Sequence, residues 1–109
     1  MIARTWRGFT SAADAEAYAA YVRRAGIPPY LATPGNRGAF ILRRMLDGEA
    51  EFLVLSLWDS MDAVRAFAGP VPERAVFYPE DARYLTRFDQ HVDHFEVVEQ
   101  AGAPVAAAG

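Results

Sequence analysis

The chain of 109 residues has the length of one domain, and its apolar fraction of 52% is that of a globular protein. The net charge of −3, with charges of both signs scattered along the chain, excludes a basic face for nucleic acid. The absence of cysteine excludes a disulfide framework, a thiolate metal site and a cysteine nucleophile. No apolar run approaches the roughly 20 residues of a membrane span. We therefore expect a cytoplasmic domain over residues 1–100, without a signal peptide, and a disordered Ala/Gly tail over residues 101–109.

The N-terminal part of the chain predicts a strand followed by a helix. Residues 2–9 carry aromatic side chains on both parities, which is typical of a strand covered on both sides. Ser11, with Asp14 three residues later, approximates a capping box. Alanine, tyrosine and valine then recur at the i, i+3, i+4, i+7 spacing of an amphipathic helix. We expect Gly26 and the two prolines after it to end this helix.

The middle of the chain predicts a β-hairpin. Residues 39–46 read as one strand, and the Asp-Gly pair at 47–48 is a strong signal for a two-residue turn. Residues 51–58 follow as a second strand, with apolar side chains on both parities. The two strands should therefore be antiparallel neighbours.

A second helix and a last strand follow the hairpin. Asp59 or Ser60 offers an N-cap to a helix over residues 60–68. The next segment is less regular, because its prolines and scattered charges argue against one long helix. It predicts two short helical turns, around residues 73–77 and 80–85. Residues 91–98 then predict the last strand.

The order β-α-β-β-α-β predicts an α+β, ferredoxin-like fold, with an antiparallel four-stranded sheet and two helices on one face. Two helices can cover only one face of such a sheet, although the strand over residues 51–58 is apolar on both. The other face would expose a large apolar patch in a monomer. We therefore predict a homodimer formed by sheet-to-sheet packing.

This pattern resembles the dimeric α+β-barrel superfamily, and within it the antibiotic biosynthesis monooxygenase-like group. The resemblance lies in the order of elements, the Trp58-Asp59-Ser60 junction with its Phe67-bearing helix, and the last strand at 94–98. It covers about residues 2–99 and implies an apolar cavity between sheet and helices in each subunit. The superfamily includes cofactor-independent oxygenases, haem-degrading enzymes, lactone isomerases and non-enzymatic members.

Three functions stay open under this resemblance. The first is the cofactor-independent oxidation of a small aromatic or quinol-like substrate. The second is the binding of a small apolar ligand by a non-catalytic dimer, and the third is an isomerase or lyase reaction in the same cavity. None of the three involves nucleic acid or a membrane as a partner.

Haem degradation is disfavoured by the residues at the positions that such relatives use. Those relatives carry an Asn on the first strand, a Trp on the second helix and an iron-ligating His just beyond it. Here no Asn lies between Ile2 and Thr10, Phe67 replaces the Trp, and Val76 or Phe77 stands near the position of the His. We expect no cofactor.

The histidines His94 and His91 are the first candidates for a catalytic base, because only histidine has an unperturbed pKa near neutrality. Their odd separation places them on opposite faces of a regular strand. His94 is preferred, since Glu96 shares its face and could orient it. As metal ligands the pair lacks a third partner. Either histidine could instead lie on the surface or at the dimer interface.

Tyr78, in the irregular segment after the second helix, is a candidate catalytic contact to an oxyanion. The substrate-binding candidates are the aromatic walls Trp58, Phe67 and Phe77 and the arginines Arg87 and Arg37. The competing interpretation assigns the aromatic residues to the core and the arginines to surface ion pairs.

Overall fold

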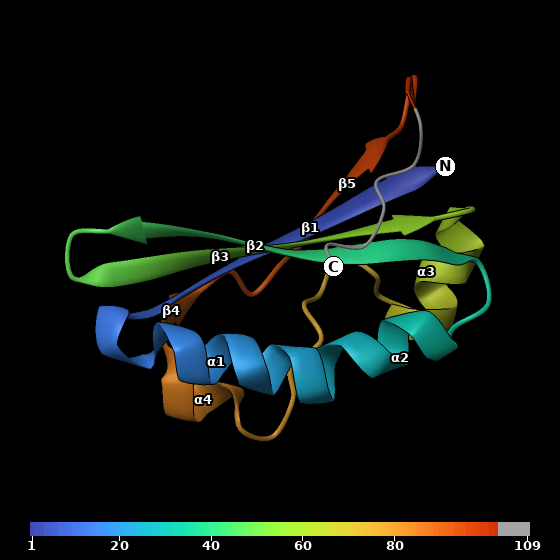
Figure 1. Cartoon of the computed structure of the whole chain (residues 1–109). Helices are drawn as coiled ribbons and strands as arrows, with labels where there is room; N and C mark the ends of the chain where they lie inside the picture. Colours follow the sequence, from blue (N-terminus) through green and yellow to red (C-terminus); the bar gives the residue numbers. More distant parts are fainter. Residues whose placement is uncertain (103–109) are drawn as a thin grey trace.

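An antiparallel sheet with every helix on one of its faces forms the frame of the molecule (Figure 1). The computed structural model describes residues 1–102, so most of the predicted tail, residues 103–109, lies outside the described residues. The main elements are β1 Ile2–Ser11, α1 Ala15–Tyr21, α2 Ile27–Ala32, β2 Asn36–Leu46, β3 Glu49–Trp58, α3 Met61–Ala68, α4 Asp81–Tyr84, β4 Leu85–Phe88 and β5 Asp93–Glu96.

The strand order is β2-β3-β1-β4, and β5 also pairs with β1. The ferredoxin-like prediction is confirmed, but two short strands share the place expected for one. β4 pairs with the C-terminal part of β1, where Gly8 faces Phe88, and β5 pairs with its N-terminal part, where Ile2 faces Glu96. The prediction of one last strand over residues 91–98 was therefore wrong in its extent.

Hydrogen bonds from another segment explain the interruption between β4 and β5. The amide of Ala75 donates to the carbonyl of Gln90, and the amide of Val92 donates to the carbonyl of Glu73. Residues 73–75 thus pair with the backbone that joins the two strands. The same bonds explain why the helical turn predicted around residues 73–77 does not form.

The first helix is longer than predicted. Ser11 caps the 3₁₀ turn Ala12–Asp14 that leads into α1, with Oγ accepting from the amide of Asp14 at 3.3 Å. Beyond α1 the chain makes a π-turn over Val22–Gly26 and enters α2, so the expected stop at Gly26 was wrong. Proline is tolerated there because the first turn of a helix has amides without intrahelical partners.

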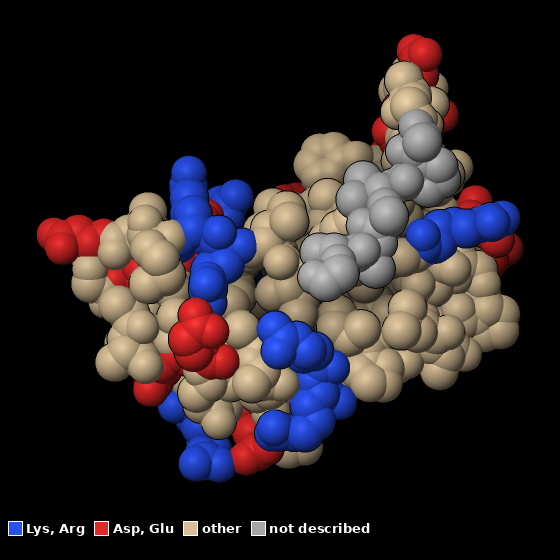
Figure 2. All heavy atoms as spheres, in the orientation of Figure 1, with Lys and Arg blue, Asp and Glu red and all other residues tan. Residues whose placement is uncertain are grey.

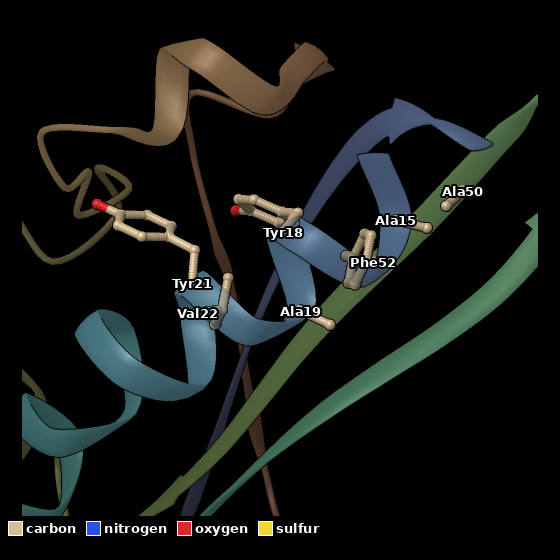
Figure 3. Close-up of a cluster of buried hydrophobic side chains, with 7 residues drawn as sticks. All are labelled: Ala15, Tyr18, Ala19, Tyr21, Val22, Ala50 and Phe52. Carbon is tan, nitrogen blue, oxygen red and sulfur yellow. The ribbon is translucent and has the colours of Figure 1, made fainter. Parts of the chain in front are cut away.

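Small residues let α1 lie close to the sheet. Ala15 and Ala19 pack against β3, beside Ala50 and Phe52 (Figure 3). The ring of Tyr18 meets Phe52 edge to face, with centroids 5.0 Å apart. This cluster fixes the distance between helix and sheet.

Trp58, at the end of β3, is fully buried, and its Nε1 donates to Ser56 Oγ at 2.9 Å. The chain then turns directly into α3, where Ser60 Oγ accepts from the amide of Ala63, so the predicted cap at Ser60 is confirmed. Tyr30 from α2 stacks on Phe67 at 4.4 Å and lies 6.1 Å from Trp58. These three rings join α2 and α3 to the end of β3.

The sheet face away from the helices carries apolar side chains that no element of residues 1–102 covers (Figure 1). Register places Phe40 beside Leu55 and Leu42 beside Leu53 on this open face. Phe40, Leu42 and Phe95 are 40%, 44% and 55% exposed. Residues 1–102 therefore leave a patch that a partner could cover.

Charged side chains of both signs are interspersed on the face drawn in Figure 2, except for a broad uncharged area over α2 and α3. Within the described part of the chain, the helices are too short or too polar to span a bilayer.

Candidate functional site

A cavity lies between β1, the α1–α2 region and the irregular segment 69–80 that connects α3 to α4. Its polar lining consists of Arg4, Asp81, Tyr18, Tyr21, Tyr30 and Tyr78. Trp6 and several valines complete the wall. The cavity offers about 30 Å³ to the centres of water-sized molecules, which is room for a few waters. A larger ligand requires its walls to move.

Arg4 is the buried cation of this cavity, only 3% exposed. Its Nη1 donates to the carbonyl of Pro72 at 2.5 Å and to His94 Nε2 at 2.9 Å, and its Nη2 donates to the carbonyl of Arg74 at 3.2 Å. Within residues 1–102 it forms no ion pair with a carboxylate. Burial lowers the pKa of Arg4, although a guanidinium stays charged at neutral pH.

Asp81, in the first turn of α4, is the buried carboxylate of the cavity. Its Oδ2 accepts from the amide of Tyr78 at 2.6 Å, and its Oδ1 accepts from the hydroxyl of Tyr18 at 3.4 Å. Burial raises the pKa of Asp81, and these two hydrogen bonds oppose that shift. A carboxylate with a raised pKa can accept a proton more readily than an ordinary one.

Tyr78 adds a hydroxyl that is not used by the fold. The hydroxyl is buried and has no hydrogen-bond partner among the described residues. Burial raises the pKa of Tyr78 to about 12, so the group stays protonated and can donate. A buried hydroxyl without a partner is costly, and a ligand atom can relieve that cost.

The cavity thus combines a cation, a carboxylate with a raised pKa and a free hydroxyl donor between aromatic walls. The carboxylate can remove a proton from a bound molecule. The cation and the hydroxyl can stabilise the negative oxygen that results. This set is sufficient for acid–base chemistry on a small ligand.

The two predicted histidines lie outside the cavity lining. His94 contacts Arg4 through Nε2, so the nitrogen that could act as a base is engaged by the guanidinium. Burial, and then the charge of Arg4, lower the pKa of His94. His91 is exposed, and its backbone forms an isolated bridge with Arg74.

The other predicted contacts divide into the cavity wall, the layer behind it and the surface. Tyr78 lines the cavity, whereas Trp58 and Phe67 lie behind Tyr30. The exposed Phe77 packs on Trp6 and Phe88 at the rim of the fold. Arg87 pairs with Glu49 and covers Phe9, and Arg37 pairs with Asp59 at 2.5 Å.

Sequence reasoning missed Arg4 and Asp81. The sequence did contain a signal for Arg4. Arg4 shares a strand face with Trp6, and that strand was predicted to be covered on both sides. The sequence offers no such signal for Asp81, which follows Glu80 in a charged, irregular segment where Glu80 pairs with Arg83.

The comparisons with known proteins identify the fold. Neither a family model nor a curated protein matches the sequence. A Bacillus cereus protein assigned as an antibiotic biosynthesis monooxygenase has a similar structure, with a TM-score of 0.68 and 14% identity over 94% of this chain and 97% of that one. The haem degrader MhuD of Mycobacterium tuberculosis gives a TM-score of 0.60 and 24% identity over 94% and 100% of the two chains. SnoaB, a cofactor-independent oxygenase of Streptomyces nogalater, gives a TM-score of 0.58 and 20% identity over 91% of this chain and 94% of that one.

These likenesses confirm the predicted α+β, ferredoxin-like fold, which this chain shares with those proteins. With identities of 14% to 24%, they establish the fold and leave the reaction to the residues of the cavity.

The cavity does not fit a haem held by histidine. The haem degrader binds two haems in its active site. Here the cavity lining contains no histidine, and His94 Nε2 is engaged by Arg4. The described residues also contain no cluster of three histidine or acidic side chains that could hold a metal ion.

Proposed function

We propose that the protein is a cofactor-independent oxygenase that acts on a small aromatic or quinol-like substrate in the cavity beside Arg4. The observation that carries this proposal is the meeting of Asp81, Arg4 and Tyr78 on the walls of one aromatic cavity. The fold shared with a cofactor-independent oxygenase supports it. His94 stays as the alternative base.

The proposed reaction begins with proton removal. Asp81 takes a proton from an acidic C–H or O–H of the substrate, and the electron pair moves onto an oxygen near Arg4 and Tyr78. The electron-rich anion then transfers electrons to O₂. For a methylene between two aromatic rings, CH₂ and O₂ become C=O and H₂O. One oxygen atom enters the carbonyl and the other leaves as water with the two methylene hydrogens, so no external reductant is needed.

The proposal includes a homodimer formed through the open face of the sheet. Phe40 and Leu42 extend a patch that continues over the partly buried leucines of β3. Near the hairpin end of this face, Glu51 pairs with Arg7 and Arg44, which adds a charged, directional cluster beside the apolar patch. A second copy presents the same patch and can cover it by two-fold symmetry.

Oxygen uptake with anthrone tests the proposed reaction. We expect one O₂ consumed for each anthraquinone formed, and a loss of rate of about 10²-fold or more in Asp81→Asn. Asp62→Asn, at an exposed carboxylate on α3, is the matched control and should leave the rate unchanged. A rate that survives Asp81→Asn but is lost in His94→Ala moves the base to His94.

Two other outcomes point to the alternative functions. Binding of anthrone without oxygen uptake supports a non-catalytic ligand-binding dimer. Conversion of a substrate without oxygen uptake supports an isomerase or lyase, for which Asp81 would still serve as the base.

A further inference from the structure

The guanidinium of Arg4 has donors left over. Nη1 uses both of its hydrogens, on the carbonyl of Pro72 and on His94, and Nη2 uses one, on the carbonyl of Arg74. Nε–H and the second Nη2–H have no acceptor among residues 1–102. Because Arg4 lines the cavity, a ligand there can reach the side chain.

The partners of Arg4 are also all neutral. They are two backbone carbonyls and an imidazole nitrogen that must be unprotonated to accept. Glu73 is near enough to raise the pKa of Arg4, but it makes no ion pair with it. Phe67 adds a ring 5.9 Å from Cζ. A buried cation without a counter-ion is costly, so an anion that enters the cavity gains from a charge already desolvated.

Tyr78 provides a second, independent observation that points to a ligand. Its buried hydroxyl has no partner among the described residues, and its side chain lines the same cavity as Arg4. Tyr30 also lies near enough for its hydroxyl to interact electrostatically with both. Charge-assisted hydrogen bonds to an anionic oxygen are the strongest that such donors can form.

We propose that the cavity is selective for small aryl oxyanions, with Arg4 as the counter-charge and the hydroxyl of Tyr78 as a second donor. The aromatic walls favour a flat ring. The anionic oxygen belongs to a carboxylate or to an ionised phenol or enol, since both present the same acceptor. This inference specifies the substrate class of the proposed oxygenase, but it rests on the cavity and not on turnover.

Asp81 restricts where the anion lies. It lines the same cavity, and an ionised Asp81 repels a second negative charge. The anion therefore belongs at the Arg4 end, and its arrival raises the pKa of Asp81 further. Proton uptake on ligand binding is an expected consequence near the pKa of Asp81.

Calorimetric binding of matched probes to the full chain tests the proposal. Benzoate and benzamide have nearly the same shape and differ in charge. We expect benzoate to bind at least about tenfold more tightly, as charge-assisted hydrogen bonds imply. The phenolate of 4-nitrophenol forms the second arm: tight binding of this probe alone assigns the oxyanion to a phenol or enol, and tight binding of benzoate assigns it to a carboxylate.

Variants identify the residues responsible. Arg4→Met should abolish the preference for benzoate, and Arg65→Met, at an exposed arginine paired with Asp62, should retain it. Tyr78→Phe removes only a hydroxyl that the described fold does not use, so it should fold normally and bind benzoate severalfold more weakly.

Three results overturn the inference: neither benzoate nor 4-nitrophenolate binding more tightly than benzamide, affinity for the preferred anion unchanged by both Arg4→Met and Tyr78→Phe, or no binding of any probe. Failure of the oxygenase proposal is distinguishable, because it leaves this charge preference intact while oxygen uptake is absent.

Discussion

Arg4 Nη1 and His94 Nε2 lie 2.9 Å apart across the β1–β5 pair, where the two residues are register partners. A guanidinium can only donate, so Nε2 accepts and the neutral ring carries its proton on Nδ1. Burial and the neighbouring charge both lower the pKa of His94. The contact makes His94 a neutral residue that positions the cation of the cavity.

The stability of the protein should therefore depend on the protonation of His94. In the unfolded chain the ring takes up a proton near pH 6.5, whereas in the folded chain it stays neutral to a lower pH. The stabilising contribution is complete above about pH 6.5 and is lost as the pH falls through the folded pKa. His94→Gln keeps an acceptor but cannot titrate. In urea unfolding, the wild type should lose more stability than His94→Gln between about pH 7 and pH 5. Parallel curves contradict the assignment.

Asp81 should set the acidic limb of any pH–rate profile. Its pKa is raised above the ordinary value of 3.8, so the carboxylate becomes available as a base only at a higher pH. In kcat/KM measured against pH, the acidic limb should lie above that value. The acidic limb should be absent from the pH profile of the residual activity of Asp81→Asn. A limb that remains in the variant would assign it to another group.

Gly8 should tolerate no side chain, because the indole of Trp6 occupies the space. A Cβ at Gly8 lies 2.4 Å from Trp6 Cη2 and 3.0 Å from a methyl of Leu85. Trp6 is held by a hydrogen bond from Nε1 to the carbonyl of Asp89 at 2.8 Å, and it also lines the cavity. Gly8→Ala should destabilise the fold by about 1–3 kcal/mol, as for other overpacked sites, and shift tryptophan fluorescence. Unchanged stability and emission contradict this packing.

Local signals predicted much of the fold. The Asp-Gly turn at 47–48, the Ser60 cap and the doubly apolar strand before it each act over a few residues, so they can be recognised without tertiary information. The split between β4 and β5 could not be predicted, because it depends on pairing with residues 73–75, far along the chain. The prolines after Gly26 gave a stop signal, but they begin a new helix.

The cavity was harder to predict than the fold because burial decides its chemistry. Arginine and aspartate are usually solvated, and nothing local to Arg4 or Asp81 announces that each is less than 10% exposed. Histidine was favoured for its intrinsic pKa, yet the contact with Arg4 occupies His94. Tyr78 was a candidate because it lies in the irregular segment after the second helix, and its side chain lines the cavity.

The open face of the sheet gives the last prediction, a dimer that one charge should dissociate. Leu55 lies at its middle, paired with Phe40 on one side and Thr5 on the other. Leu55→Lys places a charge where two copies would meet, and a buried unpaired charge costs several kcal/mol. Light scattering should give twice the 12.0 kDa monomer mass for the wild type and the monomer mass for the variant. Leu31→Lys, at a 65% exposed leucine on α2, is the matched control and should remain dimeric. A monomeric wild type, or dissociation by both variants alike, contradicts pairing through this face.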